Sequence, residues 1–166
     1  MRSPLSELGR YGAGKHPTDR SGTDERENRT MAKILLVEDE RNISLLYQTE
    51  LEAEGYEVVV AYEGVAAIKA ARDCKPDVVI VDIRLDNQMD GIELLSRLLG
   101  ENKSLPVIIN TGYSQYRDNF MTWGAEAYVL KSADLGPLKK AVADALRKQE
   151  VQQTASEGRG ALGTNP

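Results

Sequence analysis

The chain has 166 residues, of which 41% are hydrophobic, and its formal net charge is −5. This size fits one small domain with extensions and a buried core. The acidic balance argues against a nucleic-acid-binding protein, which usually carries a basic face. No stretch approaches the roughly 18 apolar residues that span a bilayer, and the single cysteine, Cys74, suits a reducing compartment. We therefore expect a cytoplasmic protein without membrane insertion and without a nucleic-acid partner.

The two ends of the chain differ in composition from the middle. Residues 1–31 mix Ser, Gly, Pro, Arg and Glu without an apolar period, which predicts a disordered extension or leader. Residues 150–166 are rich in Gln, Gly and Thr and are expected to form a flexible tail. This tail is too short for another domain, which needs at least about 50 residues. The predicted domain is therefore the segment 32–149.

Strands and helices alternate along this segment. Short apolar runs typical of buried strands lie at 34–37, 58–61, 78–81, 107–109 and 128–130. Apolar side chains at helical spacing follow them at 43–51, 65–71, 92–99, 116–123 and 135–145. Five such units imply a parallel sheet with helices on both faces. We predict a three-layer α/β fold of the flavodoxin-like type, a (βα)5 arrangement with strand order 2-1-3-4-5.

Reactive side chains follow four of the predicted strands: Glu38 and Asp39, Asp82, Thr111, and Lys131. Because the carboxyl ends of parallel strands lie along one edge of a sheet, these groups should converge on one crevice. Three carboxylates close together disfavour ionisation unless a cation lies between them. Carboxylate oxygens are ligands that Mg²⁺ prefers, commonly together with phosphate oxygens. The pattern therefore predicts a magnesium site that binds phosphate.

Asp82 is the candidate nucleophile of this site. Aspartate can form an aspartyl-phosphate, and that step needs mainly positioning and charge stabilisation from the protein. Lys131 could neutralise remaining negative charge as a point cation. Taken singly, each group has an ordinary explanation, such as a helix cap for the acidic pair or a turn residue for Thr111. Their shared edge is what indicates a site.

At these positions the sequence resembles the receiver domain of bacterial two-component response regulators. The resemblance covers about residues 32–149 and rests on five elements in order: the pair Glu38-Asp39, Asp82, Thr111, Tyr128 and Lys131. It implies that Asp82 accepts a phosphoryl group from a sensor histidine kinase or a histidine phosphotransfer protein. The product would be a conformational state that a downstream protein effector reads.

The resemblance also assigns roles around Asp82. It implies that Asp39, Asp82 and the backbone carbonyl of Arg84 bind Mg²⁺ directly, while Glu38 holds the ion through water. Thr111 and Lys131 would contact the phosphate. Tyr128 would act with Thr111 as the switch, next to an aromatic stripe formed by the residues at 116, 120 and 123.

Two stretches depart from the family pattern. The segment between Asp82 and Gly91 is one residue longer than usual and has Asp86 where a proline is common. The shape of that loop is therefore not predicted. Ser132 follows Lys131 where the family usually has a proline in a cis bond, and a cis bond before a non-proline costs roughly 2.5–4 kcal/mol. We therefore do not assume a cis bond there.

The sequence thus predicts a phosphorylation-activated signalling switch. It would not be an enzyme for other substrates, since it catalyses only the formation and hydrolysis of its own acyl phosphate. The alternative is a receiver-like interaction module that works without phosphorylation. A flavin-binding protein is disfavoured because Glu38, Asp39 and Glu40 would repel its phosphate. A metal-dependent nuclease is disfavoured because Arg84 replaces the second acid of its Asp-x-Asp pair.

Overall fold

The computed structural model describes residues 31–85, 89–119 and 123–160, which lie in one compact unit, Met31–Pro166. The elements in chain order are β1 (Lys33–Val37), α1 (Arg41–Ala53), β2 (Glu57–Ala61), α2 (Gly64–Cys74), β3 (Val78–Val81), α3 (Gly91–Glu101), β4 (Val107–Thr111), a 3₁₀ turn (Arg117–Asn119), β5 (Ala127–Leu130) and α4 (Gly136–Gly160). Residues 1–30 of the predicted extension, and Asp86 in the loop after β3, lie outside the described residues.

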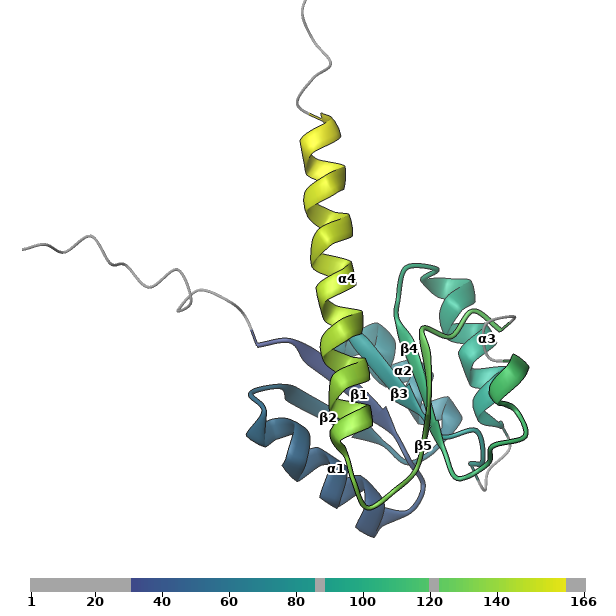
Figure 1. Cartoon of the computed structure of the whole chain (residues 1–166). Coiled ribbons are helices and arrows are strands. Elements are labelled where there is room, and N and C mark those ends of the chain that lie inside the picture. Colours follow the sequence, from purple (N-terminus) through teal and green to yellow (C-terminus); the bar gives the residue numbers. More distant parts are fainter. Residues whose placement is uncertain (1–30, 86–88, 120–122, 161–166) are drawn as a thin grey trace, which may run out of the picture. The chain divides into compact units, whose positions relative to one another are not determined.

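The five strands form one parallel sheet in the order β2-β1-β3-β4-β5, which confirms the predicted topology (Figure 1). Side chains alternate between the two faces of each strand. One face packs against α2 and α3, where Leu35, Val81 and Ile109 meet apolar side chains of those helices. The other face packs against α1 and α4, where Ile80 and Ile108 are in the same cluster. Helices therefore cover both faces, and the arrangement has three layers.

The central strand β3 is apolar along its whole length because both of its faces are covered. All four residues of β3 are at most 1% exposed. A polar residue at the end of this strand is consequently placed where the sheet leaves the core. This is the position of Asp82 and of the side chains grouped around it.

The region after β4 differs from the prediction. The described part of 116–123 contains a 3₁₀ turn at Arg117–Asn119 in place of the expected α-helix, and Phe120 lies outside the described residues. Such a short helix gains little from its own hydrogen bonds, and Gly124, with φ +82°, ends the segment. Tyr116 and Trp123 nevertheless pack together, with ring centroids 6.1 Å apart.

The C-terminal helix is longer than predicted. α4 begins at Gly136 and runs to Gly160, so residues 150–160, expected to form a flexible tail, continue the helix (Figure 1). The Gln, Glu and Ala residues in this stretch have good helix propensity, which a reading based on low hydrophobicity overlooks. In the part of the chain that the structure describes, no helix combines the length and hydrophobicity needed to cross a membrane.

Candidate functional site

The three acidic side chains predicted at the strand ends do converge. The register pairs Val37 of β1 with Val81 of β3, so the residues that follow, Glu38 and Asp82, lie side by side. One carboxylate oxygen from each of Glu38, Asp39 and Asp82 lies within 4.8 Å of the others. We call these three residues the acidic cluster.

Lys131, which follows the edge strand β5, reaches the acidic cluster across the end of β4. Its Nζ lies 2.7 Å from Glu38 Oε2 and 2.7 Å from Asp82 Oδ2. Its backbone N–H donates to the Thr111 carbonyl at 2.9 Å, which fixes the base of the side chain just beyond β5. Burial lowers the pKa of Lys131, but hydrogen bonds to Asp82 and Glu38 outweigh this and hold the pKa above its ordinary value. The ammonium therefore stays charged at neutral pH.

Asp82 is held on several sides. Its Oδ1 accepts a hydrogen bond from the backbone N–H of Arg84 at 3.1 Å, and its own N–H donates to the Val37 carbonyl at 3.1 Å. Gly91, the first residue of α3, passes so close that an added Cβ would lie 2.1 Å from the Asp82 carbonyl oxygen. A glycine is therefore required for α3 to start against the end of β3. This role of Gly91 was not predicted from the sequence.

Glu38 is 1% exposed and faces inward. Its Oε1 accepts from the Glu40 N–H at 3.3 Å, a long contact. Burial raises the pKa of Glu38, and the ammonium of Lys131 offsets part of this rise. Glu40 is the N-cap of α1, and its side chain makes no capping hydrogen bond. The N-cap position of α1 is therefore occupied by Glu40, not by Glu38 or Asp39.

A cavity of about 510 Å³ opens beside Asp82. Its lining residues are Asp39, Glu40, Asp82, Arg84, Gly112, Tyr113 and Lys131. The guanidinium carbon of Arg84 lies 5.1 Å from the centre of the Tyr113 ring. Sequence reasoning missed these two side chains at the rim. Each stands two residues after a strand-end residue of the site, and this spacing was the only signal that could have found them.

Thr111 ends β4 and is fully buried. Its Oγ1 makes no hydrogen bond within the described residues. Buried hydroxyls are nearly always hydrogen-bonded, so an unpaired one calls for an explanation. A simple explanation is that the hydroxyl donates a hydrogen bond to a group that enters the neighbouring cavity.

Tyr128 connects the cavity to another part of the surface. The Tyr128 hydroxyl donates a hydrogen bond to the backbone carbonyl of Tyr113, which lines the cavity. Its ring packs against the core cluster that also contacts Tyr116 and Trp123. Burial raises the pKa of Tyr128, so its hydroxyl keeps its proton at neutral pH and remains a donor.

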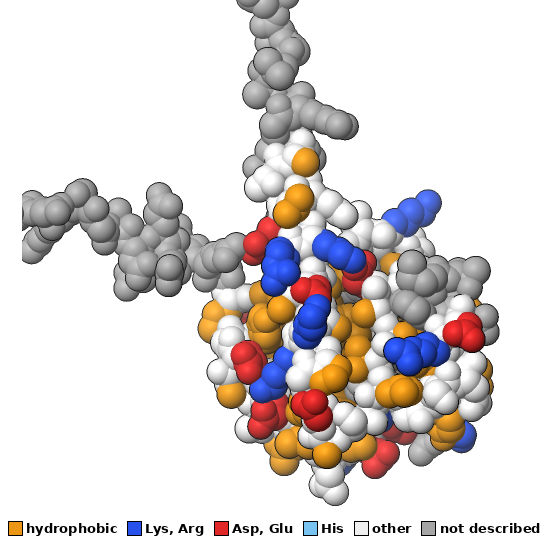
Figure 2. Space-filling model, in the orientation of Figure 1, with side chains coloured by type: hydrophobic (Ala, Val, Ile, Leu, Met, Phe, Trp, Pro, Cys, Tyr) orange, Lys and Arg blue, Asp and Glu red, His pale blue; other side chains and the backbone are white. Residues whose placement is uncertain are grey.

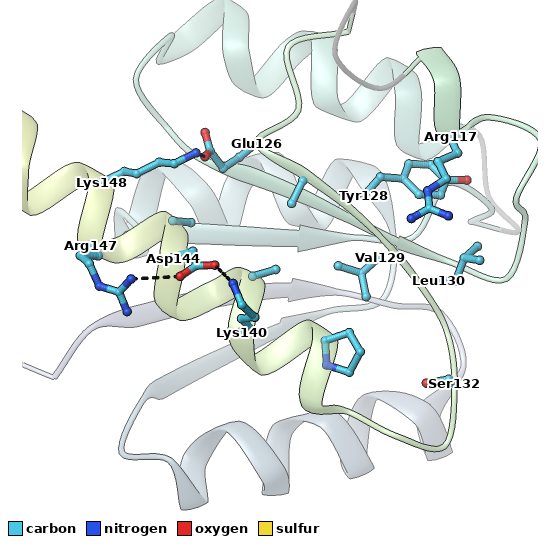
Figure 3. A pocket seen from close by; sticks show the side chains of 14 residues that line it. Arg117, Glu126, Tyr128, Val129, Leu130, Ser132, Lys140, Asp144, Arg147 and Lys148 are labelled. Carbon is cyan, nitrogen blue, oxygen red and sulfur yellow. Dashed lines mark hydrogen bonds and ion pairs between the residues drawn. The ribbon is translucent and has the colours of Figure 1, made fainter.

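A second cavity, of about 700 Å³, lies between β5 and α4 (Figure 3). Tyr128 and Arg117 stand together at one end of it, and an ion-pair chain from Lys140 through Asp144 to Arg147 lies on α4. Tyr128 is therefore shared between this surface and the loop beside Asp82.

Residues 34–143, two thirds of the chain, match the response regulator receiver domain family. The chain belongs to this family, and its fold and acidic cluster agree with that assignment. Among curated relatives, it is 34% identical over 121 residues to the response regulator ArlR of Staphylococcus saprophyticus, covering 72% of this chain and 54% of that protein. It is 33% identical over 127 residues to the Bacillus subtilis regulatory protein PhoP, covering 75% and 52%. The chain thus spans about half the length of these relatives.

Solved structures give the same result for the fold. The response regulator TrrA of Thermotoga maritima, crystallised with Mg²⁺-BeF, is 37% identical, with a TM-score of 0.66 over 70% of this chain and 100% of that one. A CheY-like receiver domain protein of Methanospirillum hungatei is 27% identical, with a TM-score of 0.69 over 74% and 99%.

Proposed function

We propose that this receiver domain, with boundaries near residues 32–149, is a phosphorylation-activated switch whose phosphoacceptor is Asp82. The observation that carries the proposal is the placement of Asp82. Its carboxylate lies beside an open cavity, with one oxygen bound by Lys131 and with two other carboxylates within 4.8 Å. The donor would be a sensor histidine kinase or a histidine phosphotransfer protein.

The transfer itself needs little covalent chemistry from the protein. An Asp82 oxygen attacks phosphorus while the bond from phosphorus to the donor imidazole nitrogen breaks, and the imidazole leaves with that electron pair. The Lys131 ammonium stabilises negative charge on the phosphoryl oxygens, and the free hydroxyl of Thr111 donates to one of them. Both groups already stand at the ends of neighbouring strands, so they need little reorganisation.

The donor set of the site fits Mg²⁺. Asp39, Asp82 and the backbone carbonyl of Arg84 would hold the ion directly and Glu38 through water, since hard oxygen ligands suit this cation. When bound, Mg²⁺ would neutralise the negative charge that the carboxylates and a phosphoryl group bring together. The TrrA structure, which contains Mg²⁺-BeF, supports this assignment.

The phosphorylated state would be read through Thr111 and Tyr128. If Thr111 moves toward the phosphoryl group, the loop that carries Tyr113 moves with it, and Tyr128 is hydrogen-bonded to that loop. Tyr128 also lines the cavity between β5 and α4. Figure 2 shows basic and acidic side chains interspersed along α4, with hydrophobic side chains on either side. This face is the proposed contact for a downstream protein effector in the cytoplasm.

The activity would extend only to the domain's own aspartyl-phosphate, which it forms and slowly hydrolyses. No observation favours the alternative, an interaction module that works without phosphorylation. The two functions are separated by incubating the protein with acetyl phosphate and Mg²⁺ and measuring its intact mass. We expect one added phosphoryl group in the wild type and none in Asp82→Asn. A wild type that gains no phosphoryl group would favour the interaction module.

A further inference from the structure

Asn110 is a buried polar residue that the proposed function does not use. It is 2% exposed and lies in β4 directly before Thr111. Its Oδ1 has no hydrogen-bond partner within the described residues. Its Nδ2 donates to the Val129 carbonyl, at a long 3.4 Å. Since buried acceptors are rarely left unpaired, an apolar residue would be the simpler choice at this position.

The sheet register places Asn110 next to the site. Ile109 pairs with Val81, so Asn110 lies beside Asp82, and on its other side Asn110 pairs with Val129. Ile108 and Val129 face the cluster covered by α1 and α4. Because side chains alternate along a strand, Asn110 and Lys131 share that face. Asn110 therefore lies between Asp82 and the strand from which Lys131 reaches it.

Lys131 competes with any cation for the acidic cluster. Its ammonium is bound to Glu38 and Asp82, two of the three carboxylates that would hold Mg²⁺. Binding of Mg²⁺ would make the ammonium give up at least part of these contacts. The Lys131 side chain is only 16% exposed, so an ammonium that gives up these contacts needs another acceptor nearby.

We infer that Asn110 is a positioning residue for Lys131: its free amide oxygen accepts the ammonium that Mg²⁺ displaces from the acidic cluster. This inference rests on the proposed Mg²⁺ site. Asn110 lies between Asp82 and the strand that leads to Lys131, on the same face of the sheet, and its amide oxygen is an unused acceptor. The same oxygen lowers the cost of metal binding before the phosphoryl group arrives and takes the ammonium.

The test is calorimetric titration with Mg²⁺ alone, without a phosphodonor. Asn110→Val removes the acceptor and should weaken Mg²⁺ binding on the order of tenfold, the equivalent of one hydrogen bond to a charged group. Asn110→Thr is the matched control, because threonine has the shape of valine but keeps an oxygen acceptor. It should retain part of the affinity that Asn110→Val loses.

A double-mutant cycle with Lys131→Met identifies the mechanism. With the ammonium gone, Asn110→Val should leave Mg²⁺ affinity unchanged. An equal loss in both backgrounds, or no loss in the wild-type background, would overturn the inference while leaving the metal site in place. A wild type that binds no Mg²⁺ would overturn both the inference and the proposed site. Thermal unfolding without Mg²⁺ shows that each variant folds, and Asn110→Val should be at least as stable as the wild type there.

Discussion

Charged groups are paired differently at the two ends of the parallel strands. At the amino ends, Lys33 and Asp77 exchange hydrogen bonds, with the Lys33 N–H donating to Asp77 Oδ2 at 2.7 Å and the Asp77 N–H donating to the Lys33 carbonyl at 2.8 Å. The Lys33 ammonium pairs with Glu57 at 3.3 Å, where both side chains are partly exposed. The charged and polar groups at this end therefore pair with one another next to solvent.

At the carboxyl ends, the same sheet buries an unbalanced set. The buried carboxylates of Glu38 and Asp82 share the ammonium of Lys131. The polar atoms Thr111 Oγ1 and Asn110 Oδ1 have no hydrogen-bond partner within the described residues. Local rules of stability are most often broken at functional sites. The contrast within one sheet agrees with the proposed ligand site at the carboxyl ends.

The largest difference should appear when a lysine is removed at each end. Lys131→Met leaves Glu38 and Asp82 close together without their cation, so it should destabilise the fold at neutral pH by about 3 kcal/mol. Lys33→Met removes a partly exposed pair and should cost at most about 1 kcal/mol. Urea unfolding of both variants measures the difference, and equal losses would remove the distinction between the two ends.

The Lys131→Met effect should also depend on pH. Burial raises the pKa of Glu38 in the folded protein above its value of 4.5 in the unfolded chain. A raised carboxyl pKa contributes stability that is complete below pH 4.5 and is lost as the pH rises through the folded value. Without Lys131 the pKa of Glu38 in the folded protein rises further. The loss of unfolding free energy in Lys131→Met, relative to wild type, should therefore shrink as the pH falls toward 4.5. Unfolding free energies measured across this range would show a constant deficit if Glu38 were not involved.

The next effect concerns two glycines of α3. Gly91→Ala should destabilise the domain by about 1–3 kcal/mol, because a Cβ there would lie 2.1 Å from the Asp82 carbonyl oxygen. It should also slow phosphorylation by moving Asp82. Gly100 is the matched control, since nothing lies within 4 Å of its added Cβ, and Gly100→Ala should raise stability by about 0.5–1 kcal/mol. Similar thermal midpoints for the two variants would contradict the close approach.

Thr111→Val should separate stability from signalling. The substitution removes an unpaired buried hydroxyl while keeping the shape of the side chain, so the unfolding free energy should stay within about 1 kcal/mol of wild type. The structural response to beryllofluoride with Mg²⁺ should weaken. The fluorescence emission of Trp123 measures this response, because this single tryptophan packs on the same core cluster as Tyr128. A full response in this variant would show that the hydroxyl is not part of the switch.

The smallest effect is expected at Cys74, the last residue of α2. Burial raises the pKa of this thiol, so at pH 8 the reactive thiolate is scarcer than in the unfolded chain. Alkylation should therefore be slower in the native protein than in denaturant, and phosphorylation should not change it. Fast native alkylation would show an activated thiol in place of a packing residue.

Sequence reasoning succeeded where a signal was periodic or stood at a strand end. The five apolar runs predicted the parallel sheet, the flavodoxin-like fold type predicted its order, and the residues after the runs predicted the acidic cluster and Lys131. For the short helix predicted at 116–123, the described part forms only a 3₁₀ turn at Arg117–Asn119, because weak local propensity does not decide the type of helix. Sequence reasoning could not foresee Gly91 or Asn110, whose roles depend on a close approach and on register between strands.

Asp82 is the residue that we propose carries the phosphoryl group. Borohydride reduces an acyl phosphate to an alcohol, so trapping after incubation with acetyl phosphate and Mg²⁺, followed by peptide mapping, marks the modified aspartate. We expect a single trapped residue at position 82 and no trapping when Mg²⁺ is chelated. Trapping at Asp39 or another acid, or trapping that is undiminished by chelation, would contradict the proposal.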